Sequence, residues 1–286
     1  MAVRIDLHCH SSTSDGTDTP AELVDAARVA GLNVLAITDH DTTAGWSEAV
    51  QALPRGVALV RGMELSCEAV SFSGGRVPVH LLGYLFNPAY PPLAAELARL
   101  QGERSRRLRV MAERMAADGL PIDPAAVLAN AGPSAGRPHL GRALVEAGVV
   151  PTVGAAFDHL LSSRGGYYVH KEDVPLQRGI ELVAAAGGVS VLAHCRAHVR
   201  GGTLSEDAIA ELVPLGLGGL EVDHVDHSDG DRARLRELAD ELGLLRTGSS
   251  DYHGRNKTVP LGAHTTAADQ YERLVAEASV TPVVQG

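Results

Sequence analysis

The stretch Ile5-Asp6-Leu7-His8-Cys9-His10-Ser11-Ser12-Thr13-Ser14-Asp15-Gly16 begins as a short apolar run and ends in two histidines and an acid. If residues 3–10 form a strand, its side chains alternate between two faces, so His8 and His10 point the same way. Two neighbouring imidazoles suit a divalent transition metal, and Asp15 in the following turn can add an oxygen ligand. Without matching residues downstream, two chance histidines on a surface strand would explain the stretch equally well.

The segments after this stretch predict a repeating strand and helix pattern. A helix should run from Pro20 to about Ala30, because Thr19 can cap it and proline fits its first turn. Residues 32–38 (LNVLAIT) form a short apolar run typical of a strand covered on both faces. A strand, a helix and a buried strand in this order favour a parallel sheet or barrel, in which chemistry gathers where the strands end. His40 lies just after the predicted end of the strand over residues 32–38.

The same pattern recurs along the chain. A strand over residues 57–60 leads toward Glu64, and a hairpin over residues 67–72 and 77–84 contains His80. A lone histidine in an apolar strand is usually a hydrogen-bonded core residue. After residue 174 we expect helices over residues 176–186 and 229–242 and strands over residues 189–193, 219–222 and 244–247. These later strands lead to His194, to Asp223-His224 and to Ser250-Asp251-Tyr252-His253.

The pattern is interrupted between residues 91 and 174, which predict mainly helices. We therefore expect residues 1–90 and 175–286 to form a catalytic barrel, and residues 91–174 to form a helical insertion that acts as a substrate lid. A long helix over residues 96–117 carries an arginine run, which we interpret as a solvated helix face: Arg99, Arg104, Arg106, Arg107 and Arg109. In the turn Gly136-Arg137-Pro138-His139, the arginine and histidine can meet a phosphate together with free helix N–H groups.

Composition restricts the class of protein. The chain has 286 residues, enough for one catalytic domain with an insertion, and no apolar run of the length that a membrane span requires. No export signal is evident and the three cysteines do not form a disulfide or zinc-finger pattern, so we expect a cytoplasmic protein with reduced thiols. A formal charge of −10 disfavours a long nucleic acid as partner but allows a small phosphorylated ligand.

Histidines and acids recur where the predicted strands end, a distribution that chance does not favour. Their mixed nitrogen and oxygen ligands, without cysteine, fit Mn, Fe or Zn in a catalytic cluster, and nine ligands can hold three ions. The residues are His8, His10, Asp15, His40, Glu64, His80, His194, Asp251 and His253.

Together these motifs resemble the PHP (polymerase and histidinol phosphatase) family of metal-dependent phosphoesterases. The resemblance rests on the motifs His8-x-His10, Asp15-Gly16, Thr38-Asp39-His40-Asp41, Gly62-x-Glu64, Ala193-His194 and Ser250-Asp251-x-His253. It implies a distorted (β/α)7 barrel that holds three divalent ions, with Mn favoured and Fe or Zn as alternatives. It also implies three ligand sets, which are His8, His10, Glu64 and Asp251; Glu64, His80 and His194; and Asp15, His40 and His253.

The insertion, with its Gly136-Arg137-Pro138-His139 turn, resembles the bacterial branch that dephosphorylates nucleoside 3',5'-bisphosphates. This implies a phosphatase that hydrolyses a phosphate monoester of a small nucleotide, such as a bisphosphate or a nucleoside monophosphate, with a metal-bridging hydroxide as nucleophile. The alternative is a phosphodiesterase or 5'-3' exoribonuclease on short RNA or cyclic nucleotides. A non-catalytic module is disfavoured, because all nine ligands are present.

The chemistry of ester hydrolysis and the motifs also suggest roles for individual residues. His194 or Asp251 is expected to protonate the leaving group. Arg137, His139 and Arg196 are the predicted substrate-phosphate contacts, with a surface salt bridge as the alternative for Arg137. Cys195 stands where the family usually has proline, and we expect a structural thiol there, since a thiol reacts only where its pKa is lowered. The base, the sugar, the native metal and the oligomeric state stay open.

Overall fold

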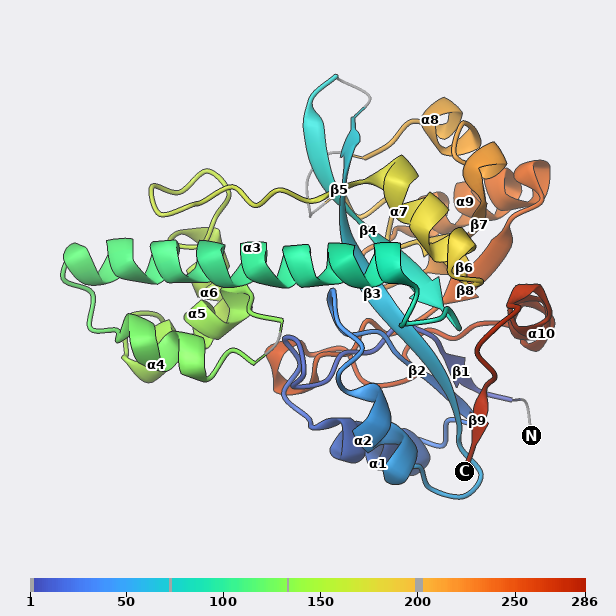
Figure 1. Ribbon diagram of the computed structural model, residues 1–286, viewed down its shortest axis with the longest axis horizontal. Helices are drawn as coiled ribbons and strands as arrows, with labels where there is room; N and C mark the ends of the chain where they lie inside the picture. The colour runs from blue at the N-terminus through green and yellow to red at the C-terminus, as the bar shows by residue number, and fades with distance from the viewer. Residues whose placement is uncertain (1–2, 72–73, 133, 199–202) are drawn as a thin grey trace.

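The computed structural model describes residues 3–71, 74–132, 134–198 and 203–286, and its centre is a single sheet (Figure 1). Seven strands follow one another across the sheet in the order β1-β2-β3-β4-β6-β7-β8. They are β1 (Ile5–Asp6), β2 (Val34–Ile37), β3 (Ala58–Val70), β4 (Arg76–Tyr84), β6 (Val189–Leu192), β7 (Leu217–Asp223) and β8 (Leu245–Gly248). The short strands β5 (Val174–Pro175) and β9 (Val284–Gln285) both pair with β3.

Along the path from β1 to β8, neighbouring strands are parallel except at β4, which is antiparallel to both β3 and β6. Off this path, β5 is parallel and β9 antiparallel to β3. The two outer strands meet again beyond their ends. Cys9 and Tyr252 form a parallel bridge, the backbone N–H of His10 donates to the carbonyl of Tyr252 at 2.8 Å, and that of Ser250 donates to Asp6 Oδ1 at 3.1 Å. The sheet is therefore a nearly closed barrel, which confirms the fold that the family resemblance implies.

Helices cover the outside of the barrel. They are α1 (Pro20–Val29), α2 (Trp46–Gln51), α7 (Leu176–Ala185), α8 (Glu206–Ala210), α9 (Asp229–Leu242) and α10 (Ala268–Glu277), with short 3-10 turns at η2 (Val213–Leu215) and η3 (Gly254–Asn256). The start of α1 is as predicted. Thr19 Oγ1 accepts from the backbone N–H of Glu22, whose carboxylate accepts from that of Thr19, so the two residues form a capping box.

Alternate residues of β2 pack on opposite sides of the sheet. Leu35 and Ile37 belong to a core that includes Leu23 of α1, while Val34 and Ala36 belong to a second core built from the other faces of the strands. All four β2 residues are buried, as expected of a strand covered on both faces.

The insertion is helical and has a hydrophobic core of its own. Its helices are α3 (Pro91–Ala117), α4 (Pro124–Ala129), α5 (Arg137–Glu146) and α6 (Val153–Asp158). In Figure 1, α3 extends from the barrel to the far side of the molecule, where α4 and α5 lie against it and α6 packs on α5. The core of this part includes Leu108, Met111, Leu140 and Leu144.

β3 is longer than its sequence predicts. The expected strand over residues 57–60 extends to Val70, because β4 pairs with it from Gly62 onward after its parallel partner β2 has ended. Glu64 therefore lies inside a strand and not at its end. Phe72 of the predicted hairpin lies outside the described residues. Among the helices described, none is long and apolar enough to cross a lipid bilayer.

Candidate metal centre and active site

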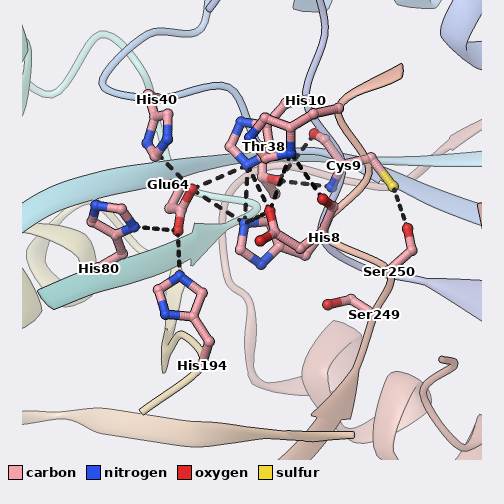
Figure 2. Close-up of polar contacts among 12 residues, drawn as sticks. His8, Cys9, His10, Thr38, His40, Glu64, His80, His194, Ser249 and Ser250 are labelled. Carbon is pink, nitrogen blue, oxygen red and sulfur yellow. Dashed lines mark hydrogen bonds and ion pairs between the residues drawn. The ribbon is translucent and has the colours of Figure 1, made fainter. Parts of the chain in front are cut away.

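The nine predicted metal ligands lie together at one end of the barrel. Glu64 occupies the middle of the cluster, and the imidazoles of His40, His80 and His194 point toward its carboxylate (Figure 2). Eight of the nine are buried, and His80 is half-buried. Segments far apart in the sequence meet here because the carboxyl ends of parallel strands share one edge of the sheet.

The first group contains His8, His10, Glu64 and Asp251, and their ligand atoms all lie within 4.8 Å of one another. Both imidazoles direct Nε2 into the group. Glu64 Oε2 lies 3.2 Å from His8 Nε2 and 3.0 Å from His10 Nε2, and Asp251 Oδ1 lies 3.4 Å from each. These four residues are the first set that the resemblance implies.

The second group gathers around the other oxygen of Glu64. Glu64 Oε1 lies 2.7 Å from His80 Nδ1 and 3.0 Å from His194 Nε2. His40 Nδ1 lies 3.2 Å from Oε2, so His40, Glu64 and His80 also form a compact group. Since its two oxygens face different sets of imidazoles, Glu64 could contribute a ligand oxygen to each of two groups.

The third group contains His10, Asp15, His40 and His253. The Asp15 carboxylate lies between three imidazoles, with Oδ1 3.3 Å from His253 Nε2 and 3.6 Å from His10 Nδ1, and Oδ2 3.7 Å from His40 Nε2. His10 thus joins the three residues that the resemblance implies for this set.

The side chains of the cluster fit bound cations. Nδ1 of His40 is buried and has no hydrogen-bond partner among the described residues, yet it faces Glu64 Oε2. A neutral imidazole nitrogen that points its lone pair at a carboxylate is stabilised when a cation lies between them. Burial lowers the pKa of His40 well below its usual value, which favours the neutral form that binds metal. Burial alone would raise the pKa of Glu64, but His80, His40 and His8 around it hold that pKa well below its usual range.

Glu221 of β7 is a buried acid beside the cluster that the sequence analysis did not single out. It is fully buried, and its Oε1 lies 3.0 Å from His8 Nδ1, on the side of the ring opposite the cluster. Oε2 accepts the backbone N–H of His194 at 2.8 Å, where the backbone is left-handed with φ 31°. Glu221 therefore orients two proposed ligands on different strands. The signal in the sequence was an acid flanked by Leu220 and Val222 within a mostly apolar strand.

Three other buried acids brace the loops that carry the ligands. Asp6 accepts from the hydroxyl of Ser250 at 2.6 Å, Asp39 from the hydroxyl of Ser11 at 2.6 Å, and Asp41 from the backbone N–H of Ser66 at 2.6 Å. Each contact ties one segment of the site to another, so the ligands are held before any ion binds.

A cavity of about 730 Å³ lies beside the cluster, between the barrel and the insertion. His40, Glu64, His80, His194 and Asp251 are among its lining residues on the barrel side. The insertion contributes cationic and aromatic side chains, namely Arg104, Arg107, Arg137, Phe157, Tyr168 and Lys171.

Two arginines of α3 correct our interpretation of the arginine run. Arg99, Arg106 and Arg109 are exposed, as a solvated helix face requires, but Arg104 and Arg107 are buried and line the cavity. The interpretation was wrong for these two, because the helix face that carries them packs against the barrel and not against water.

The structure separates the three predicted phosphate contacts. Arg137 lines the cavity, its guanidinium 5.1 Å from the Phe157 ring centroid and 5.6 Å from that of Tyr168. His139 and Arg196 are not among the residues that line it. His139 is buried, and its Nδ1 lies 3.1 Å from the backbone nitrogen of Gly136 at the start of α5. Arg196 lies 3.3 Å from a carboxylate oxygen of Glu206.

Cys195 also lines the cavity. Burial raises the pKa of its thiol to about 12, so the thiol stays protonated at neutral pH. This environment agrees with the structural role expected from the sequence.

Comparisons with known proteins agree with this site. The PHP domain model matches residues 6–120. The chain is 36% identical over 252 residues to a 3',5'-nucleoside bisphosphate phosphatase of Chromobacterium violaceum, covering 87% of each protein. It is 32% identical to a 5'-3' exoribonuclease of Haemophilus influenzae, covering 94% of this chain and 97% of that one. A solved structure from Bifidobacterium adolescentis, described as a metal-dependent phosphoesterase, superposes with a TM-score of 0.90 at 36% identity and 98% coverage of both chains.

A barrel whose strands converge on a cluster of histidines and carboxylates, with such relatives, defines a metal-dependent hydrolase of phosphoric esters. The chain belongs to the PHP family.

Proposed function

We propose that the chain is a phosphatase that removes a phosphate monoester from a small nucleotide, such as a nucleoside 3',5'-bisphosphate or a nucleoside monophosphate. The proposal includes three divalent ions, preferably Mn, on the nine ligands of the site. The observation that carries it is one cavity that joins this cluster to buried, positively charged side chains of the insertion. A bisphosphate carries two phosphate groups. One can lie at the metal-binding cluster and the other at the cationic side chains of the insertion.

The surroundings of Arg107 support the proposal that the substrate carries a second anionic group. Its side chain is buried and forms no hydrogen bond or ion pair with any residue that the structure describes, and it lines the cavity. Burial, together with the nearby charges of Arg137 and Arg104, lowers the pKa of Arg107. An uncompensated buried charge is costly, so an anionic ligand at this place would stabilise the fold as well as bind. Arg104 differs, because Asp41 already pairs with it.

The aromatic rings of the insertion support a nucleotide as the ligand. Phe157 and Tyr168 both line the cavity, and a planar base can stack on such rings. Arg137 packs near both rings and donates to the carbonyl of Leu161 at 2.9 Å, which fixes its guanidinium at the cavity wall. We therefore propose that residues 91–174 form the substrate lid.

The chemistry follows from the residues around the reacting group. Bound divalent ions would lower the pKa of water and offset the charge of the phosphoryl oxygens. Arg107 and Arg137 would bind and orient the rest of the substrate, and the lid would limit water in the cavity. His194 and Asp251 both face the cavity and are the candidates for passing a proton to the leaving oxygen.

A phosphodiesterase or exoribonuclease on short RNA or cyclic nucleotides is the second candidate. The 32% identity to an exoribonuclease over nearly the whole chain favours it. Against long RNA stand the net charge of −10 and the aromatic content of 3%, since an RNA groove uses basic tracks and stacking rings.

A phosphate-release screen tests the proposed substrate class. The Mn-loaded protein is offered adenosine 3',5'-bisphosphate, AMP, a cyclic nucleotide and a 5'-phosphorylated oligonucleotide. Phosphate release is measured together with chromatography of the nucleotide products, because hydrolysis of a diester yields a nucleotide and no free phosphate. We expect the highest kcat/KM for the bisphosphate. Replacing Arg107 by Met should lower kcat/KM for the bisphosphate about 100-fold, and for AMP by less than tenfold, since a hydrogen-bonded charge contributes about 3 kcal/mol.

Arg109→Met is the matched control, because Arg109 lies on the same helix and is exposed. It should leave both substrates unaffected. Equal losses on both substrates with Arg107→Met, or a preference for the oligonucleotide, would contradict the bisphosphate proposal.

A further inference from the structure

Lys257 places a positive charge at the edge of the metal-binding cluster. It directly follows η3 and lines the cavity, and its Nζ donates to Asp251 Oδ2 at 2.6 Å. The loop before it is anchored, because Asn256 Nδ2 donates to the carbonyl of Asp15 at 2.6 Å. The chain's only other lysine, Lys171, lines the same cavity.

The two oxygens of Asp251 have different surroundings. Oδ1 faces His8 and His10 of the first group. Oδ2 faces Lys257 and, at 3.4 Å, Nε2 of the buried His224. His224 Nδ1 lies 3.0 Å from the backbone nitrogen of Asp226, which donates to it, so Nε2 carries the proton and donates to Asp251. The carboxylate is therefore oriented from behind by an imidazole, without Lys257.

An ammonium group beside a set of cation ligands needs an explanation. Two like charges this close repel, so Lys257 weakens the affinity of Asp251 for a metal ion. His224 already orients the Asp251 carboxylate, so Lys257 is not needed for that. The Lys257 side chain lines the cavity and is 31% exposed, so it is not needed to fill the protein core either. Lysine is a compact charge with three N–H donors on a flexible stem, which suits an anionic group that enters and leaves.

We propose that Lys257 is a catalytic residue that donates a hydrogen bond to a phosphoryl oxygen of the ester. The attacking water supplies the oxygen of the new P–O bond and gives up a proton, the ester P–O bond breaks, and the leaving oxygen takes up a proton. The positive charge of Lys257 stabilises the negative charge on the phosphoryl oxygens as that charge is redistributed in the transition state. This inference rests on the phosphoesterase activity and not on the identity of the nucleotide.

The test replaces Lys257 by Met and by Arg and measures hydrolysis of p-nitrophenyl phosphate, so that it is independent of the proposed nucleotide. With Lys257→Met we expect kcat to fall about 100-fold at saturating Mn²⁺, the typical loss when one donor to a reacting oxygen is removed. Lys257→Arg should recover part of that loss, because it keeps the charge. Arg255→Met removes an exposed cation of the same loop and should leave kcat unchanged.

Binding of Mn²⁺ to the metal-free protein, measured by calorimetry, separates catalysis from a structural role. A catalytic Lys257 predicts that Lys257→Met binds Mn²⁺ as tightly as the wild type or more tightly. A kcat within about threefold of the wild type would overturn the proposal. So would weaker Mn²⁺ binding combined with activity that excess Mn²⁺ restores, since Lys257 would then only hold Asp251. Thermal unfolding of each variant, with Lys257→Gln as a second neutral replacement, checks that the losses do not come from misfolding.

Discussion

Glu64 shows how much the site depends on single side chains. One carboxylate contacts five imidazoles, those of His8, His10, His40, His80 and His194. It is 1% exposed, so its charge is compensated only by what surrounds it. Imidazoles bind metal ions in their neutral form, so bound cations would supply the positive charge that a buried carboxylate shared among them needs.

His139 is the residue for which sequence and structure suggest different roles. The resemblance predicts a phosphate contact, while the structure places it against the first turn of α5 and away from the cavity wall. Burial lowers the pKa of His139 to about 4, so the folded protein keeps it neutral. The unfolded chain takes up a proton near pH 6.5, and the free energy of unfolding therefore falls as the pH drops from about 6.5 toward 4.

We predict that His139→Gln removes this pH dependence. Between pH 7 and pH 4.5 the wild type should lose about 2 kcal/mol more unfolding free energy than the variant, measured by urea denaturation. The KM for the substrate should stay the same, because a residue that supports a helix end does not touch the ligand. A tenfold higher KM with identical pH profiles of stability would restore the phosphate-contact hypothesis.

Among the secondary-structure elements, α3 connects the insertion to the metal-binding end of the barrel. Arg104 of α3 pairs with Asp41, and its NH2 group donates to the Ser66 hydroxyl at 2.8 Å. Gln101 donates to the backbone carbonyl of Asp41 at 2.9 Å. Asp41 directly follows His40 and has a left-handed backbone with φ 52°, so α3 braces the loop that presents a proposed metal ligand.

Replacing Arg104 by Met should therefore destabilise the protein strongly. Removing one partner of a buried ion pair costs about 3–5 kcal/mol, because the other charge stays buried. Arg106→Met on the same helix breaks an exposed pair with Glu103 and should cost less than about 1 kcal/mol. Urea denaturation of both variants measures the difference. Similar small losses would show that α3 does not brace the barrel through Asp41.

The sequence predicted elements well where local chemistry decides them. The Thr19 cap and Gly243, which is left-handed at the end of α9, define helix ends close to those expected. The prediction failed where contacts with a distant part of the chain determine the structure. β3 continues through Glu64 only because β4 pairs with it, and the burial of Arg104 and Arg107 depends on which face of α3 meets the barrel. Neither contact is visible in a local pattern.

Eight of the nine candidate metal ligands were predictable from the sequence because they belong to short motifs at strands, while His80 is a lone histidine within a predicted strand. The residues that support them were not. Glu221 lies within β7, and His224 follows it at a predicted strand end that was noted but given no role. Their roles come from contacts across the barrel. Lys257 lies in a loop, where the spacing of residues does not predict in which direction a side chain points.

At the scale of the whole molecule, the charge is unevenly distributed. The formal charge is −10, yet Arg104, Arg107, Arg137 and Lys171 line one cavity beside the acidic metal ligands. A negative surface disfavours long polyanions, while a small anion that enters the cavity meets concentrated positive charge. This distribution favours a small phosphorylated substrate over a long nucleic acid.

Titration of the metal-free protein with Mn²⁺, with phosphate release from adenosine 3',5'-bisphosphate as readout, tests the central claim most directly. The geometry contains three groups of candidate ligands. We predict no release without metal and a rise that levels off at about three ions per chain. Full activity in the metal-free protein, or no phosphate release once the protein is saturated with Mn²⁺, would contradict the account.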